Sequence, residues 1–182
     1  MTRRASVSPP GFDAADLQRL LRGGFRLAVA ESLTGGLLAD AIVTVPGASR
    51  VFSGAVVAYD THLKHSLLDV DANLLAERGP VDPAVAEQMA RGVRRICAVP
   101  HAPGETSLPA DLGIATTGVA GPAPDPQTGQ PAGTVWVGVS SSLGERSRRF
   151  DLPGDREAVR SGAVEAALSE LREELERLQD RD

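Results

Sequence analysis

Two side chains that could act as a nucleophile and its base, Ser32 and Lys64, each follow a predicted β-strand. Ser32 lies between the apolar run 25–31 and a helical pattern over 35–45, so it occupies a strand-to-helix turn. Lys64 follows the apolar segment 54–60, which is the second predicted strand. A neutral lysine can accept the hydroxyl proton of a serine, whose oxygen then attacks an acyl carbon. These residue types therefore indicate acyl-transfer chemistry.

Lys64 is the single lysine among the 19 basic residues of the chain; all the others are arginines. An arginine stays protonated in a protein, whereas burial lowers the pKa of a lysine. A chain that uses arginine elsewhere could keep its one lysine where a neutral amine is needed. A carboxylate at Asp60, if it lies close, would oppose that decrease in pKa.

A structural interpretation of the same residues is also open. Serine and threonine are preferred N-cap residues, so Thr34 could cap the following helix while Ser32 is only a turn residue. On these two residues alone, this is the simpler interpretation. In the same way, Tyr59 could close its strand and Lys64 could be a solvated residue of a short helix.

The secondary structure must bring these side chains to one edge of a sheet. If 25–31, the next helix and 54–60 form a βαβ crossover, the two strands are parallel and their carboxyl ends share an edge. Ligand sites of open α/β sheets gather at that edge. A third predicted strand, within 111–122, would bring Thr116, Thr117 and the turn GVAG there if it is also parallel.

The remaining segments complete a layered α/β domain. Residues 1–11 are polar and Pro-rich and are expected to form a loose arm, with 12–182 as a single domain. Helices are predicted over 12–24, 81–99 and 154–182. Strands are predicted over 133–142 and, at an edge of the sheet, over 145–154.

Two of these helices have a clear apolar face. The helix over 81–99 begins with Asp82 as N-cap and Pro83 at its first position. Its expected buried residues are Val85, Met89, Val93 and Ile96. The last helix repeats apolar residues at spacings of four and three, which favours packing on the sheet, with a dimer seam as the alternative. The residues of this stripe are Val164, Leu168, Leu171, Leu175 and Leu178.

Composition excludes several classes of function. The net charge is -5 and no long basic run occurs, so nucleic acid is not expected as a partner. No leader and no long apolar segment is present, which predicts a cytoplasmic protein without a membrane span. Cys97 is the only cysteine, so an internal disulfide is excluded. The three histidines lack metal-ligand spacing, and the P-loop and GxGxxG motifs are absent, so we expect no metal or other cofactor.

Several motifs, in order and at matching intervals from about residue 13 to 175, resemble the CinA C-terminal domain family. They are AESLTGGLLADAI, VPGASRVFSGAVVAYDTHLK, LLDV, ATTGVAGP, GTVWVGV and LPGDREAVR. This family includes the nicotinamide mononucleotide deamidases called PncC. The resemblance implies a three-layer α/β/α sandwich with a mostly parallel or mixed sheet, often forming a homodimer. It also implies hydrolysis of the carboxamide of nicotinamide mononucleotide to nicotinic acid mononucleotide and ammonia.

The resemblance also implies roles for individual residues. Ser32 matches the proposed nucleophile of the family and Lys64 its proposed base, with Tyr59 in the same motif. Backbone N–H groups near Gly35, Gly36 or the turn at Gly118 could hold the oxyanion. The positions expected to bind substrate are Thr34, Gly35, Gly36, Ser49, Thr117, Gly118, Arg156 and Arg160.

The chain departs from the family pattern in two loops. Asp60 and Thr61 replace a common Ser-Asn pair, and Ala123, Pro124 and Asp125 stand in a segment that is Gly-rich in many relatives. An insertion around 100–110 could shape the site or lie on the surface. Because the competence and damage label of the family names no mechanism, a non-catalytic nucleotide-binding or regulatory module is the alternative function.

Overall fold

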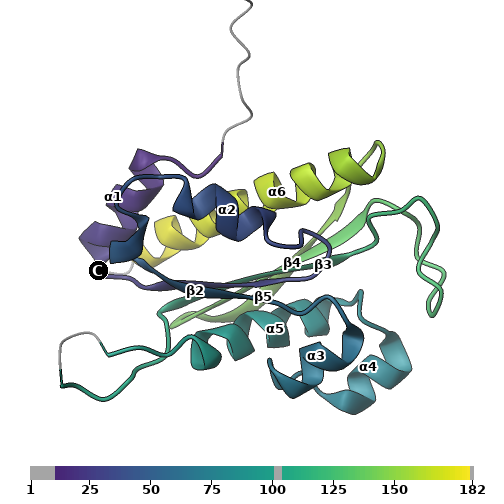
Figure 1. Cartoon of the computed structure of the whole chain (residues 1–182), viewed down its shortest axis with the longest axis horizontal. Helices are drawn as coiled ribbons and strands as arrows, with labels where there is room; N and C mark the ends of the chain where they lie inside the picture. Colours follow the sequence, from purple (N-terminus) through teal and green to yellow (C-terminus); the bar gives the residue numbers. More distant parts are fainter. Residues whose placement is uncertain (1–10, 101–103, 181–182) are drawn as a thin grey trace, which may run out of the picture.

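The computed structural model describes residues 11–100 and 104–180 and contains one five-stranded sheet between two layers of helices (Figure 1). The strand order across the sheet is β2-β1-β3-β4-β5. The strands are β1 (Leu27–Glu31), β2 (Phe52–Val57), β3 (Leu112–Gly118), β4 (Thr134–Ser141) and β5 (Gly144–Asp151). The predicted arm over 1–11 lies, apart from Gly11, outside the described residues.

Helices cover both faces of the sheet (Figure 1). One layer consists of α1 (Ala14–Gly23), α2 (Leu37–Val43) and α6 (Arg156–Gln179). The other consists of α3 (Thr61–Ser66), α4 (Ala72–Arg78) and α5 (Pro83–Ile96). This arrangement confirms the predicted three-layer α/β class.

The direction of the strands decides where their ends meet. β1 is parallel to both β2 and β3, so the carboxyl ends of these three strands lie at one edge, as the crossover argument predicts. β4 and β5 are antiparallel to their neighbours, which makes the sheet mixed. The loop after β3 and the beginning of α6 therefore return to that same edge.

The apolar stripes predicted from helical periodicity form the two cores. In α6, Leu168, Leu171, Leu175 and Leu178 are buried and Val164 is partly buried against the same cluster, so this stripe packs on its own sheet. In α5, Val85, Met89 and Val93 are buried on the opposite face of the sheet. The prediction for Ile96 is wrong: this last residue of α5 is 52% exposed, and Cys97, four residues after Val93, packs against the cluster instead.

The structure corrects two local expectations. α4 was not predicted, although Asp71 caps it through hydrogen bonds from the backbone N–H groups of Asn73 and Leu74. The N-cap prediction for Thr34 is wrong: α2 begins after Gly36, and the Thr34 hydroxyl instead contacts that of Thr116 at 2.8 Å. By contrast, Asp82 caps α5 as expected, with Pro83 at the first position.

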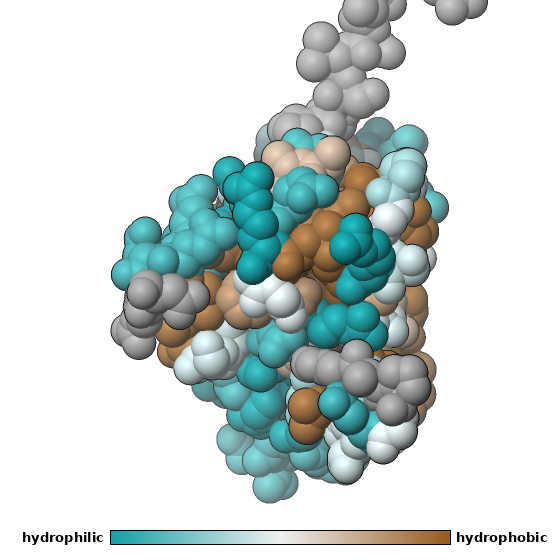
Figure 2. Space-filling model, turned by 90° about the vertical axis from the view of Figure 1, so that its left-hand side faces the viewer, coloured by the Kyte–Doolittle hydropathy of each residue, from teal (hydrophilic) through white to brown (hydrophobic). Residues whose placement is uncertain are grey.

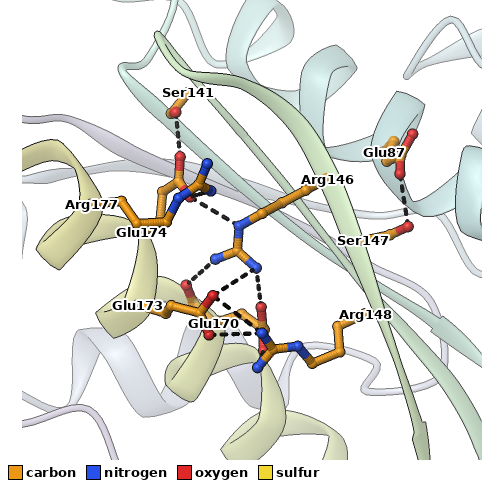
Figure 3. A network of polar contacts seen from close by, with 9 residues as sticks. All are labelled: Glu87, Ser141, Arg146, Ser147, Arg148, Glu170, Glu173, Glu174 and Arg177. Atoms are coloured by element: carbon orange, nitrogen blue, oxygen red, sulfur yellow. Dashed lines mark hydrogen bonds and ion pairs between the residues drawn. The ribbon is translucent and has the colours of Figure 1, made fainter.

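A buried charged network joins the β4–β5 hairpin to α6 (Figure 3). The Arg146 guanidinium donates hydrogen bonds to the carboxylates of Glu170 and Glu174, both of which are almost completely buried. Burial would raise the pKa of the Glu174 carboxyl, but hydrogen bonds from Ser141 and Arg146 hold that pKa below its ordinary value. The stability contributed by Glu174 is thus present above its unfolded pKa and is lost as the pH falls through its folded value.

The β5 edge of the sheet is charged, and one end of the molecule carries apolar patches. β5 carries four charged side chains from Glu145 to Arg149, which protects this edge from pairing with another strand. The end that carries α1 and the C-terminus shows apolar patches within a mostly hydrophilic surface (Figure 2). Among the residues described, no helix has the length and apolarity needed to cross a bilayer.

Arg146→Met should lower the free energy of unfolding by about 3 kcal/mol, because it removes the most buried cation of the network and leaves the buried carboxylates of Glu170 and Glu174 with the half-exposed Arg148 and Arg177. Arg149→Ala is the matched control, since Arg149 pairs with the exposed Asp151, and it should cost less than about 1 kcal/mol. Urea denaturation of both variants at neutral pH measures the difference. Equal losses in the two variants would contradict a stabilising role for the buried network.

Candidate active site

Ser32 sits on a turn that is anchored to two strands. It follows the last residue of β1, and its backbone N–H donates a hydrogen bond to the Thr116 carbonyl of β3 at 3.0 Å. The carboxylate of Glu31 accepts hydrogen bonds from the N–H groups of Gly36, Leu38 and Ala39 at 2.8–3.2 Å. The chain's own carboxylate therefore occupies the N-terminus of α2, where an anionic ligand would otherwise bind.

Lys64 reaches Ser32 from α3, the helix that follows the neighbouring parallel strand β2. α3 begins directly after β2 with Asp60 as its N-cap, which accepts a hydrogen bond from the His62 N–H at 2.8 Å. The Lys64 ammonium donates to the Ser32 hydroxyl at 3.0 Å and to the Ala58 carbonyl at 2.8 Å. Its side chain is only 1% exposed, so these two oxygens replace most of its water. The predicted convergence of the two residues is thus present in the geometry.

Burial lowers the pKa of Lys64 to about 8. The negative charge of Asp60 acts in the opposite direction, as expected from the sequence, but the loss of hydration is the larger effect. An appreciable share of Lys64 is therefore neutral just above physiological pH. A neutral amine at 3.0 Å from a serine hydroxyl can accept its proton.

A cavity of about 410 Å³ opens in front of this pair, within the ~300–1,000 Å³ typical of small-molecule sites. It lies at the edge where the loop after β3 extends (Figure 1). Ser32, Lys64 and Tyr59 line it together with Arg156 from the beginning of α6. Arg156 donates to the Tyr59 hydroxyl at 2.7 Å and to the Gly121 carbonyl at 2.9 Å, which places a cation at the rim.

Other predicted site residues line the cavity or shape its turns, but their polar groups are bonded within the protein. Thr117 and Gly118 line the cavity, but the Thr117 hydroxyl is already bound to the Pro80 carbonyl at 2.6 Å. Gly118 has no room for a side chain, because a Cβ atom would lie 2.6 Å from the Thr134 carbonyl oxygen. The N–H groups of Gly35 and Gly36 donate to the Ser32 carbonyl and to Glu31, respectively, so neither is free to hold an oxyanion.

Five of the predicted binding residues do not line this cavity, namely Gly35, Gly36, Thr34, Arg160 and Ser49. Thr34 is fully buried beneath the turn, and Arg160 lies behind it with its guanidinium on the carbonyls of Leu33 and Thr34. Ser49 lies in a short 3₁₀ helix before β2, at the end of the sheet opposite to the carboxyl ends of β1, β2 and β3. It lines a separate hollow of about 360 Å³ together with Val43 and Phe52.

A family model described as the CinA C-terminal domain matches residues 13–175. The chain belongs to the CinA C-terminal domain family. This domain is 45% identical over 156 residues to a CinA-like protein of Frankia casuarinae, covering 86% of the chain and 33% of that relative. It is 43% identical over 151 residues to a putative competence-damage inducible protein of Desulforamulus reducens, covering 83% and 34%. The chain thus spans about a third of the length of these relatives.

Solved structures of the family share this fold. A CinA superfamily protein from Klebsiella pneumoniae has a TM-score of 0.79 and 33% identity, covering 89% of this chain and 94% of that one. A CinA superfamily protein from Escherichia coli has a TM-score of 0.76 and 32% identity, covering 87% and 85%. These similarities agree with the α/β sandwich predicted from the motifs.

The loop that departs from the family pattern forms one wall of the cavity in this CinA domain. Pro124, Asp125 and Pro126 line it, and sequence reasoning did not assign them to the site. Side-chain amides fasten this loop to the α4 layer: Gln127 donates to the carbonyls of Leu75 and Ala76 and Gln130 to that of Val81. The only available signal was the loop's position directly after the GVAGP turn.

Neither the insertion nor a metal centre adds to the described site. In the described part of the insertion, Leu108 forms a β-bridge with Val99 and no residue lines the cavity. Residues 101–103 lie outside the described ranges. Within 11–100 and 104–180, no three His, Cys, Asp or Glu side chains gather in a way that could hold a metal ion.

Lys64→Met should be at least as stable as the wild type at neutral pH. The unfolded chain holds the lysine proton up to about pH 10.5, whereas the folded protein releases it near 8, so wild-type stability rises with pH between these values. The difference corresponds to about 3 kcal/mol of electrostatic cost at neutral pH. Urea denaturation across this range should show the advantage of the variant shrinking as the pH rises.

Ser32→Ala is the matched control for this measurement, because it keeps the buried amine and should keep the rise in stability with pH. A stability difference between Lys64→Met and the wild type that is constant with pH would contradict the lowered pKa of Lys64.

Proposed function

We propose that this domain is an amidohydrolase that converts nicotinamide mononucleotide to nicotinic acid mononucleotide and ammonia. The observation that carries the proposal is the 3.0 Å contact between the Ser32 hydroxyl and the buried Lys64 amine at the floor of a cavity. A serine and a neutral lysine at this distance form a nucleophile-base pair for acyl transfer. The family resemblance supplies the substrate.

The reaction proceeds in two acyl-transfer steps. Neutral Lys64 takes the hydroxyl proton as the Ser32 oxygen bonds to the carboxamide carbon, which forms a tetrahedral oxyanion. Protonated Lys64 then gives the proton to the departing nitrogen, so that ammonia leaves and an ester of Ser32 remains. Water, deprotonated by Lys64, attacks the ester, the proton returns to the Ser32 oxygen, and the carboxylic acid product then loses its proton to solvent to become a carboxylate.

The oxyanion needs a hydrogen-bond donor near Ser32. The N–H of Leu33, the residue after the nucleophile, donates to no acceptor in the part of the chain that the structure describes. Leu33 also lines the cavity. In strand-turn-helix nucleophile turns the N–H of the residue after the nucleophile serves this purpose. We assign the same role to Leu33 in place of the expected Gly35 and Gly36.

The phosphate of the substrate needs a cation at the other end of the cavity. Arg156 and Lys64 are the cationic side chains among its lining residues, and Lys64 is engaged with Ser32. The Arg156 guanidinium stands at the rim with Tyr59, where it can form charge-assisted hydrogen bonds with a phosphate. This orientation directs the carboxamide inward to Ser32, and it makes Tyr59 a binding residue at the rim.

The alternative is a module that binds a nucleotide without converting it. The names of the relatives, which refer to competence and damage, describe no reaction. The polar cavity with Arg156 at its rim is compatible with binding alone. The homodimer and the cytoplasmic location stay predictions.

Purified protein should release ammonia from nicotinamide mononucleotide without added metal, and Ser32→Ala should lose this activity by several orders of magnitude. Lys64→Arg keeps the positive charge but cannot supply a neutral amine, so it should be similarly inactive while folded. Coupled ammonia detection measures turnover, and calorimetry measures binding. Binding without turnover by the wild type would favour the alternative module.

The kcat/KM for this reaction should increase with pH around a midpoint of about 8, because only neutral Lys64 accepts the Ser32 proton. Asp60→Asn should move the midpoint lower, since the Asp60 carboxylate raises the pKa of Lys64, and asparagine still caps α3. Steady-state kinetics over a pH series tests both statements. An unchanged midpoint in Asp60→Asn would contradict the assignment of the titration to Lys64.

A further inference from the structure

Two arginines one turn apart on α6 serve different parts of the site. Arg156 donates to Tyr59 and to the Gly121 carbonyl at the rim of the cavity. Arg160, four residues later, turns to the protein side and does not line the cavity. Its guanidinium donates to the Leu33 carbonyl at 3.0 Å and to the Thr34 carbonyl at 2.9 Å.

These two carbonyls belong to the residues that directly follow Ser32. A trans peptide unit is rigid and planar, so a hydrogen bond that fixes a C=O also fixes the direction of the N–H on the same unit. Arg160 thereby fixes the peptide units that join Leu33 to Thr34 and Thr34 to Gly35. The Gly35 N–H in turn donates back to the Ser32 carbonyl at 3.2 Å. The orientation of the nucleophile turn is thus coupled to one guanidinium.

The turn has other supports, such as the hydrogen bond from the Ser32 N–H to the Thr116 carbonyl, but among the described residues only Arg160 donates to the Leu33 carbonyl. Gly35 and Gly36 both have positive φ angles, 59° and 101°, which glycine adopts easily but which impose no single conformation. The Glu31 carboxylate holds the α2 side of the turn through Gly36. A Cβ atom on Gly35 would lie 3.4 Å from the Arg160 guanidinium, so the cation packs directly on the turn.

We propose that Arg160 is a positioning residue that holds Ser32 and the Leu33 N–H in their reactive orientation, and that it does not bind substrate. The inference rests on the proposed role of Ser32 as nucleophile. Charged hydrogen bonds to two successive carbonyls suit this purpose, because they define both position and direction. Arg156 then contacts the ligand, whereas Arg160 holds the turn that carries Ser32.

Arg160→Gln should lower kcat for nicotinamide mononucleotide by ~10²-fold with KM nearly unchanged, because a small misplacement of the nucleophile acts on the chemical step. Arg160→Lys keeps the charge and part of the hydrogen bonding and should recover part of that loss. Arg156→Gln is the matched control on the same helix and should mainly raise KM. A rise in KM alone for Arg160→Gln, or an unchanged kcat, overturns the proposal.

A second readout separates this inference from the identity of the substrate. A fluorophosphonate that reacts with activated serines should label Ser32 in the wild type, and intact mass measures the rate. Labelling should be slowed in Arg160→Gln, partly restored in Arg160→Lys and unchanged in Arg149→Gln, a control on β5 that does not line the cavity. If the wild type is labelled but releases no ammonia, the substrate assignment fails while the slowed labelling still supports Arg160. Equal labelling rates in all variants, or no labelling of the wild type, overturn the inference.

Discussion

The burial of one amine against one hydroxyl is the constraint on which the rest of this site depends. Lys64 is 1% exposed and exchanges its hydration for the Ser32 hydroxyl and the Ala58 carbonyl, so its folded pKa lies near 8. Burying the ammonium costs free energy at neutral pH, so the scaffold must hold the two oxygens that replace its water in place. The same loss of hydration lowers the pKa of Lys64, so that its neutral amine can act as a base.

The scaffold meets this demand by fixing both partners through strands. Parallel pairing of β1 with β2 and β3 brings the Ser32 turn and the beginning of α3 to one edge of the sheet. The Glu31 carboxylate and the Arg160 guanidinium then hold the turn from two sides. Far from the cavity, the Arg146 network ties β5 to α6, the helix that carries Arg160. Stability and the geometry of the nucleophile therefore share one helix.

Much of this arrangement could be predicted from local patterns. Continuous apolar runs located the strands, period-3.6 apolar residues located most of the helices, and strong caps such as Asp82 set the beginnings of helices. The prediction for Ile96 was wrong because apolar residues at spacings of three and four both fit a helical face, and Cys97 occupies the buried position after Val93. The N-cap interpretation of Thr34 was wrong, although threonine is a suitable cap residue. The carboxylate of Glu31, the last residue of β1, accepts hydrogen bonds from the N–H groups at the beginning of α2 instead.

By itself, the sequence determined the α/β class, the crossover that brings Ser32 and Lys64 together, and the chemistry of a lone lysine beside a serine. Only the tertiary structure decided which donors are free and which side chains face the cavity. Gly35 and Gly36 lose their N–H groups to neighbours, Ser49 lies at the other end of the sheet, and Arg156 and Arg160 diverge from one helix. Hydrogen-bond partners and burial arise from contacts between distant segments, and residue type and spacing along the chain do not encode them individually.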